Sequence, residues 1–97
     1  MNQSNAVTLR GAVSTTPTEV EVGAETRIEF RLVVPRESGG NDSLNCFVVD
    51  SRLLARAGKL SEGKRLEVAG ELRSRFWRAA GRTAATMEVE VQRMRLL

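Results

Sequence analysis

Histidine is absent from this 97-residue sequence, and cysteine occurs once, at Cys46. The carboxylates alternate along predicted strands as solvated rows, with no pair set for proton transfer. The sequence also contains no glycine motif of the kind that cradles phosphate groups. These absences exclude the common catalytic centres and metal sites. We therefore expect a protein that is not an enzyme and uses no cofactor, metal or small-molecule substrate.

Long apolar runs are also missing. No stretch approaches the length of a membrane helix, and the N-terminal residues MNQSNAV lack the charged-then-apolar pattern of a signal peptide. A single thiol forms no internal disulfide, which favours an intracellular compartment. We therefore expect a cytoplasmic protein with no membrane partner. The length and a composition that is 41% hydrophobic and 28% charged predict one domain over residues 1–97.

Aromatic residues make up only 4% of the chain, and the net charge is only +3. A charge this small does not by itself indicate nucleic acid. Its distribution is more informative, because no acidic residue lies between Leu72 and Met87. That interval contains four arginines, namely Arg73, Arg75, Arg78 and Arg82.

The segment from Gly63 to Arg82 is the part of the sequence from which function is predicted. Apolar and polar residues alternate through its first half, which is typical of a half-buried strand. The polar face continues to Arg73, Arg75 and Trp77, the only tryptophan, while Phe76 continues the core face. An indole beside guanidinium groups on an open sheet face suits a base that stacks and a phosphate that meets a cation.

Alternation predicts four further strands, at Asn5–Val13, Thr26–Val34, Leu44–Val49 and Ala85–Arg95, with a brief extended stretch at Glu19–Val22. A short helix follows a cap at Asp50 or Ser51. Three strands, a helix and two strands predict an all-β OB-fold, a five-stranded Greek-key barrel with the helix between strands 3 and 4. Another five-stranded barrel remains open.

Several side chains are assigned to the core by the same patterns. Phe30 and Phe76 follow core rows, Met87 and Met94 are expected to pack, and Cys46 is expected to be a small buried residue. In the first strand, Gly11 predicts a sharp bend or a close approach of two backbones.

Beyond these patterns, the chain resembles the bacterial single-stranded DNA-binding protein family, especially short actinobacterial-type members lacking the acidic C-terminal tail. The stretches NAVTLRGAVSTTPTEV, EGKRLEVAGELRSRFW and MEVEVQRMRLL carry the resemblance, over roughly Asn5 to Leu97. It implies a homo-oligomer, a tetramer or dimer, that binds single-stranded DNA without sequence preference. It also implies a nucleoid-associated role in DNA replication, recombination or repair.

By position, the resemblance makes Trp77 a stacking residue and makes Arg73 and Arg75 basic residues of the same strand. The chain departs from the family near Arg36, Asn45 and Ser51, where the family often has aromatic residues. It also ends in the basic residues RMRLL, so recruitment of partners through an acidic tip does not carry over.

The predicted nucleic-acid-binding residues are Trp77, Arg73, Arg75, Arg78, Arg82, Arg10, Arg31 and Phe47. Alternatives stay open for each: Trp77 packing on another subunit, arginines forming a solvated edge, or Glu29 neutralising Arg27 or Arg31. Two other functions also stay open, a protein-interaction adaptor of a replication-restart complex and an RNA-binding OB domain.

Overall fold

The computed structural model describes residues 2–97 and is mostly β, with one short helix. In chain order the elements are β1 (Val7–Val13), β2 (Thr18–Val22), β3 (Glu25–Pro35), β4 (Asn41–Val48), α1 (Ser51–Gly58), β5 (Arg65–Ala79) and β6 (Arg82–Leu96). The predicted strands are present, and the last two form a long hairpin whose second strand is longer than expected. They are joined by a turn of two residues, Ala80 and Gly81, both with positive φ, as tight hairpins require.

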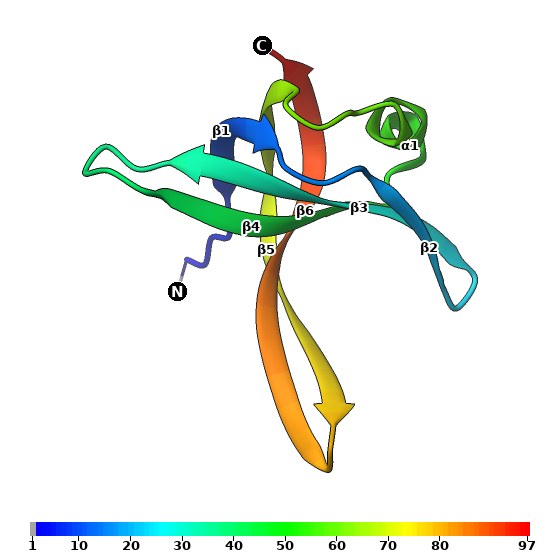
Figure 1. Cartoon of the computed structure of the whole chain (residues 1–97). Helices are drawn as coiled ribbons and strands as arrows, with labels where there is room; N and C mark the ends of the chain where they lie inside the picture. Colours follow the sequence, from blue (N-terminus) through cyan, green and yellow to red (C-terminus); the bar gives the residue numbers. More distant parts are fainter. Residues whose placement is uncertain (1) are drawn as a thin grey trace.

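The strands pair in the order β1-β5-β6-β4-β3-β2, and β1 also pairs with β3. All pairs are antiparallel except β4 with β6, which is parallel. Because β1 pairs with both β5 and β3, five strands form a continuous ring and β2 flanks β3 outside it. In Figure 1, the long β5–β6 hairpin crosses the β3–β4 hairpin, and its outer half projects beyond the rest of the fold.

The prediction of five strands is wrong by one. The stretch Glu19–Val22 was expected only to extend briefly, yet Thr18–Val22 is a strand whose five residues all pair with β3, from Thr18 opposite Glu29 to Val22 opposite Glu25. Gly23, with φ of 63°, makes the tight turn that allows this hairpin. The helix therefore follows the fourth strand of the chain instead of the third.

The helix begins as its cap predicts. The Asp50 side chain accepts a hydrogen bond from the backbone N–H of Arg52 at 2.9 Å. The Arg52 guanidinium also bonds this carboxylate and lowers the pKa of Asp50 to about 2. Leu53 and Ala57 are buried, so one face of α1 packs on the core.

Two glycines mark places where backbones touch. A Cβ at Gly11 would collide with the carbonyl oxygen of Val33, which confirms the predicted close approach. A Cβ at Gly70 would collide with the carbonyl oxygen of Glu90. Gly70 adjoins a bulge, because Ala69 pairs with Arg93 whereas Gly70 pairs with Val91. The extra residue lies in β6, so the alternation of β5 continues unbroken to Trp77.

Most of the predicted core is confirmed, including Phe30, Cys46 and Met94. Phe76 and Met87 are corrections, because they are 68% and 53% exposed. Leu72, on the same face as Phe76, is 38% exposed. By their positions in β5 and β6, all three lie from the middle of the hairpin toward its turn. No second layer covers the projecting half of this ribbon (Figure 1). Alternation predicted their shared face correctly but not that the face would be open.

Candidate nucleic-acid interface

A groove of about 720 Å³ is lined by residues at and just before the start of β2, by the middle of β3 and β4, and by the β5–β6 hairpin. Trp77 and Arg75 of β5 line it, together with Arg31 of β3 and Asn45 of β4. Threonine side chains and carboxylates complete the lining, at Thr15, Thr16, Thr18, Thr86, Glu29 and Glu88. Most of these groups are hydrogen-bonding side chains, and Trp77 supplies a large flat apolar surface among them.

Trp77 is 41% exposed, so part of the indole is open to the groove. Its cross-strand neighbour is Ala84, a side chain too small to cover a ring of this size. Arg75 lies two residues earlier on the same face of β5. The structure thus brings together an accessible indole and a guanidinium, together with Arg31 from another strand.

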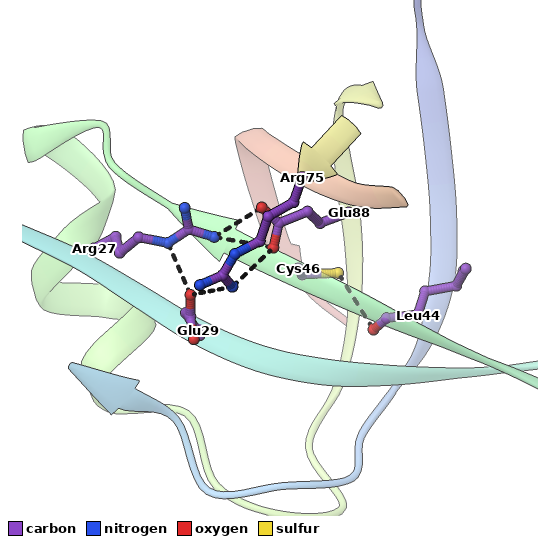
Figure 2. Close-up of polar contacts among 6 residues, drawn as sticks. All are labelled: Arg27, Glu29, Leu44, Cys46, Arg75 and Glu88. Carbon is purple, nitrogen blue, oxygen red and sulfur yellow. Dashed lines mark hydrogen bonds and ion pairs between the residues drawn. The ribbon is translucent and has the colours of Figure 1, made fainter. Parts of the chain in front are cut away.

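A network of ion pairs joins three residues that line the groove, Glu29, Arg75 and Glu88, to Arg27 (Figure 2). Both carboxylate oxygens of Glu88 accept hydrogen bonds from Nη2 of Arg27, at 3.0 and 3.1 Å. Glu29 Oε2 lies 2.9 Å from Nε of Arg27, but the N–H does not point at it, so this contact is an ion pair without a hydrogen bond. Arg75 reaches Glu29 at 3.5 Å and Glu88 at 3.9 Å.

This network corrects the expectation of a solvated carboxylate row, because Glu88 is only 7% exposed. It also decides between two alternatives for Glu29, which pairs with Arg27 and Arg75 and not with Arg31. The charged groups lining the groove are therefore Arg31 and Arg75 against Glu29 and Glu88, a net charge of zero.

Phe47 lies beneath the network. The Arg27 guanidinium carbon is 3.9 Å from the centre of the Phe47 ring, and the side chain is buried. This is a cation–π contact between a partly desolvated cation and a ring. A base would reach Phe47 only after Arg27 had left Glu88, so the predicted stacking on Phe47 is not available in this arrangement.

Arg73 lies two residues before Arg75 on the same face of β5 but does not line the groove. Its guanidinium lies 3.1 Å from Glu71 and 3.1 Å from Glu90, and the hydrogen bond to Glu71 raises the pKa of Arg73. Hydrogen bonds from Gln92 and Arg73 in turn lower the pKa of Glu71. A phosphate would have to compete with both carboxylates for this arginine.

Arg78 and Arg82 lie at the tip of the hairpin and are exposed. Within residues 2–97, no carboxylate pairs with either of them. Arg31 donates from Nε to the Ser43 hydroxyl at 3.1 Å. Arg10 is placed elsewhere, where Nε donates to Glu67 at 2.6 Å, and Glu67 borders a different groove beside α1.

Cys46 borders the Trp77 groove but is almost fully buried, and burial raises the pKa of its thiol to about 12. The prediction of a small core residue is confirmed. In the part of the chain that the structure describes, no three His, Cys, Asp or Glu side chains are grouped to hold a metal ion. Nor does any helix there have the length and apolar character needed to cross a bilayer.

Sequence reasoning missed the carboxylates and the threonine and asparagine side chains that line the groove. Alternation had placed Glu29 and Glu88 on outward faces. That placement was the only feature of the sequence that could have pointed to them as surface groups of the site. The contact of Glu88 with Arg27 depends on β3 and β6 both lying beside β4. Asn45 occupies one of the places where the family resemblance leads one to expect an aromatic ring, and it does line the groove.

A mostly β chain with one short helix, whose strand ring closes through β1 and β3, has an OB-fold-like arrangement. Comparison with solved structures finds chains of similar fold. The chain is 29% identical to the dimeric N-terminal domain of PriB protein from Thermoanaerobacter tencongensis, with a TM-score of 0.73 and 96% of each chain covered.

Two further structures are similar in fold. The small single-stranded DNA-binding protein of Streptomyces coelicolor is 19% identical, with a TM-score of 0.75 over 99% of this chain and 95% of that one. The Plasmodium falciparum SSB in complex with ssDNA is 22% identical, with a TM-score of 0.83 over 100% and 99%. No family model and no curated protein sequence matches. These structures share the fold that the resemblance to single-stranded DNA-binding proteins implies.

Proposed function

We propose that the chain is a single OB-fold domain over residues 1–97 that binds single-stranded DNA without sequence preference. Its five-stranded ring is a Greek-key barrel, with α1 joining two of the ring's strands. It acts by binding, without catalysis, in DNA replication, recombination or repair, in the cytoplasm at the nucleoid. The observation that carries this proposal is the half-exposed Trp77 in a groove beside Arg75.

The groove suits unpaired bases better than a duplex. Every base has a flat face, so stacking on Trp77 requires no particular sequence. The face is accessible only to a base that has left its own stack. Hydrogen-bonding side chains such as Thr86 and Asn45 line the same groove and are available to the polar edges of a stacked base.

Phosphate contact is assigned mainly to Arg78 and Arg82, with Arg73 and Arg75 as secondary contacts. The groove itself carries no net charge, and both of the secondary arginines already pair with carboxylates. The two hairpin-tip arginines have no such competitor among the described residues. A bound strand would therefore release counterions from these two cations more readily than from Arg73 and Arg75.

The salt dependence of binding tests this assignment. For an Arg78→Ala/Arg82→Ala variant, the plot of log affinity for a dT oligomer against log salt is expected to become less steep by about 1.4, or about 0.7 for each phosphate that the variant no longer neutralises. Fluorescence anisotropy of a labelled oligomer, measured at several salt concentrations, supplies the slopes.

Arg10→Ala is the matched control, because Arg10 pairs with Glu67 outside the groove. It is expected to leave the slope unchanged. An unchanged slope in the double variant would contradict the phosphate assignment. Duplex DNA that competes as well as the dT oligomer would contradict the proposal as a whole.

We propose further that the protein works as a homo-oligomer, a dimer or tetramer.

A second candidate function, a protein-interaction adaptor, is favoured by the similarity to a dimeric PriB domain. Partner capture that persists without nucleic acid and in Trp77→Ala would support the adaptor. Parallel titrations with matched RNA and DNA oligomers separate the RNA-binding alternative, because stacking alone does not distinguish the two.

A further inference from the structure

The β5–β6 ribbon has a second exposed face, opposite Trp77. Leu72 and Phe76 alternate along β5 on that face, and Met87 of β6 lies between them opposite Ser74. Ser74 Oγ is 3.5 Å from the Met87 sulfur, so the register brings the two strands' side chains into contact here. Phe76 is the most exposed aromatic ring in the described residues. Its cross-strand neighbour, Ala85, is small.

The charge of this face differs from that of the Trp77 face. Arg78 is two residues beyond Phe76 on the same side of β5. No acidic residue occurs between Leu72 and Met87. The Trp77 side, in contrast, carries three carboxylates within ion-pair distance of Arg73 or Arg75, namely Glu71, Glu88 and Glu90. The second face therefore combines an open ring, a thioether and a cation with no carboxylate beside them.

We propose that this face is a second nucleobase-stacking surface, in which Phe76 receives a base and Arg78 meets a phosphate of the same strand. This proposal rests on the proposed function and adds a binding residue to it. A single strand that passes around the hairpin tip would contact Trp77 on one side of the ribbon and Phe76 on the other. Arg78 and Arg82 lie at that tip.

Unpaired bases fit this face better than a second copy of the chain does. A stable interface between proteins takes roughly 20–30 residues from each partner, whereas this ribbon is two strands wide and exposes three large apolar side chains. An aromatic ring with an adjacent arginine is, by contrast, sufficient to hold one base and its phosphate. The absence of carboxylates removes the repulsion that a phosphate meets elsewhere on this hairpin.

The first test compares Phe76→Ala with Phe76→Tyr, which keeps the ring. With a dT oligomer of ~20 nucleotides, longer than the roughly 4–16 nucleotides that one OB-fold occupies, Phe76→Ala is expected to raise the Kd about tenfold. Phe76→Tyr is expected to keep near-native affinity. Equal affinities for Phe76→Ala and the native protein would overturn the inference.

The second test places a reporter on the face itself. In the double variant Trp77→Phe/Phe76→Trp, the only indole is at position 76, and its emission is expected to be quenched by the oligomer. Emission that stays constant while anisotropy shows saturable binding would overturn the inference and leave the proposed function intact. A native protein that binds no oligomer would contradict both the inference and the proposed function.

Sedimentation of the free native protein and of free Phe76→Ala tests whether a second copy of the chain covers this face instead of a base. If Phe76→Ala changes the oligomeric state of the free protein and leaves oligomer affinity unaltered, the face is an interface between copies and the inference is wrong. The expected result is an unchanged sedimentation coefficient together with the weakened binding.

Discussion

Replacing Glu88 by alanine is expected to lower the free energy of unfolding by about 3 kcal/mol, because it leaves a buried arginine without its main partner. Arg27 and Glu88 are both buried, and their two hydrogen bonds are 3.0 and 3.1 Å long. Glu29 remains near Arg27 in the variant, which places the expected loss at the lower end of the range for a broken buried pair.

Urea unfolding at one fixed protein concentration measures this loss. Glu90→Ala is the control, since Glu90 pairs with the half-exposed Arg73, and a pair of that kind contributes less than about 1 kcal/mol. Glu88→Gln, which retains one hydrogen-bond acceptor, is expected to fall between the two. A Glu88→Ala protein as stable as the Glu90→Ala protein would show that the network is not a structural support.

Trp77→Ala is expected to weaken binding of a dT oligomer by about 1–3 kcal/mol, a rise in Kd of roughly 5- to 150-fold. The loss follows from removal of the stacking surface in the groove. Stability is expected to change little, because the indole is 41% exposed and Trp77 lies near the hairpin turn at Ala80 and Gly81.

Fluorescence anisotropy with a labelled oligomer gives the affinities, and urea unfolding checks the stability of the variant. Trp77→Phe, which keeps a smaller ring, is expected to lose less affinity than Trp77→Ala. Full affinity in a folded Trp77→Ala protein would show that the indole does not stack on a base and would favour its alternative assignment, packing on another subunit.

Local patterns were sufficient to predict much of this fold. The strands follow from alternation, since a residue's face in a strand is fixed by its position. The helix follows from the Asp50 cap and the spacing of Leu53 and Ala57. Gly11 indicated a close backbone contact, and that contact is present. Each of these features depends on a few neighbouring residues.

Features that depend on distant parts of the chain were not predictable in the same way. Alternation placed Phe76 and Leu72 on one face but gave no sign that the hairpin extends past the rest of the sheet. Glu88 is buried because Arg27, 61 positions away in sequence, covers it and also covers Phe47. The pairing that makes Thr18–Val22 a full strand depends likewise on β3.

The candidate site likewise has features that were predictable from local patterns and features that were not. The shared face of Trp77 and Arg75 was predictable from the period of β5, and both line the groove. The neutral charge of the groove was not, because it depends on Glu29 and Glu88 arriving from two other strands. Of the four arginines between Leu72 and Met87, Arg78 and Arg82 have no carboxylate partner among the described residues, and this was known only once the pairs of Arg73 and Arg75 were known.

The most direct test of stacking in the Trp77 groove is a titration of the native protein's tryptophan emission with a dT oligomer at low salt. Trp77 is the only tryptophan, so the signal comes from the groove alone. The emission is expected to be quenched to saturation by the single strand and to recover as salt is added. Emission that stays constant at low salt with the single strand, as it does with a duplex, would contradict the assignment of this groove to unpaired bases.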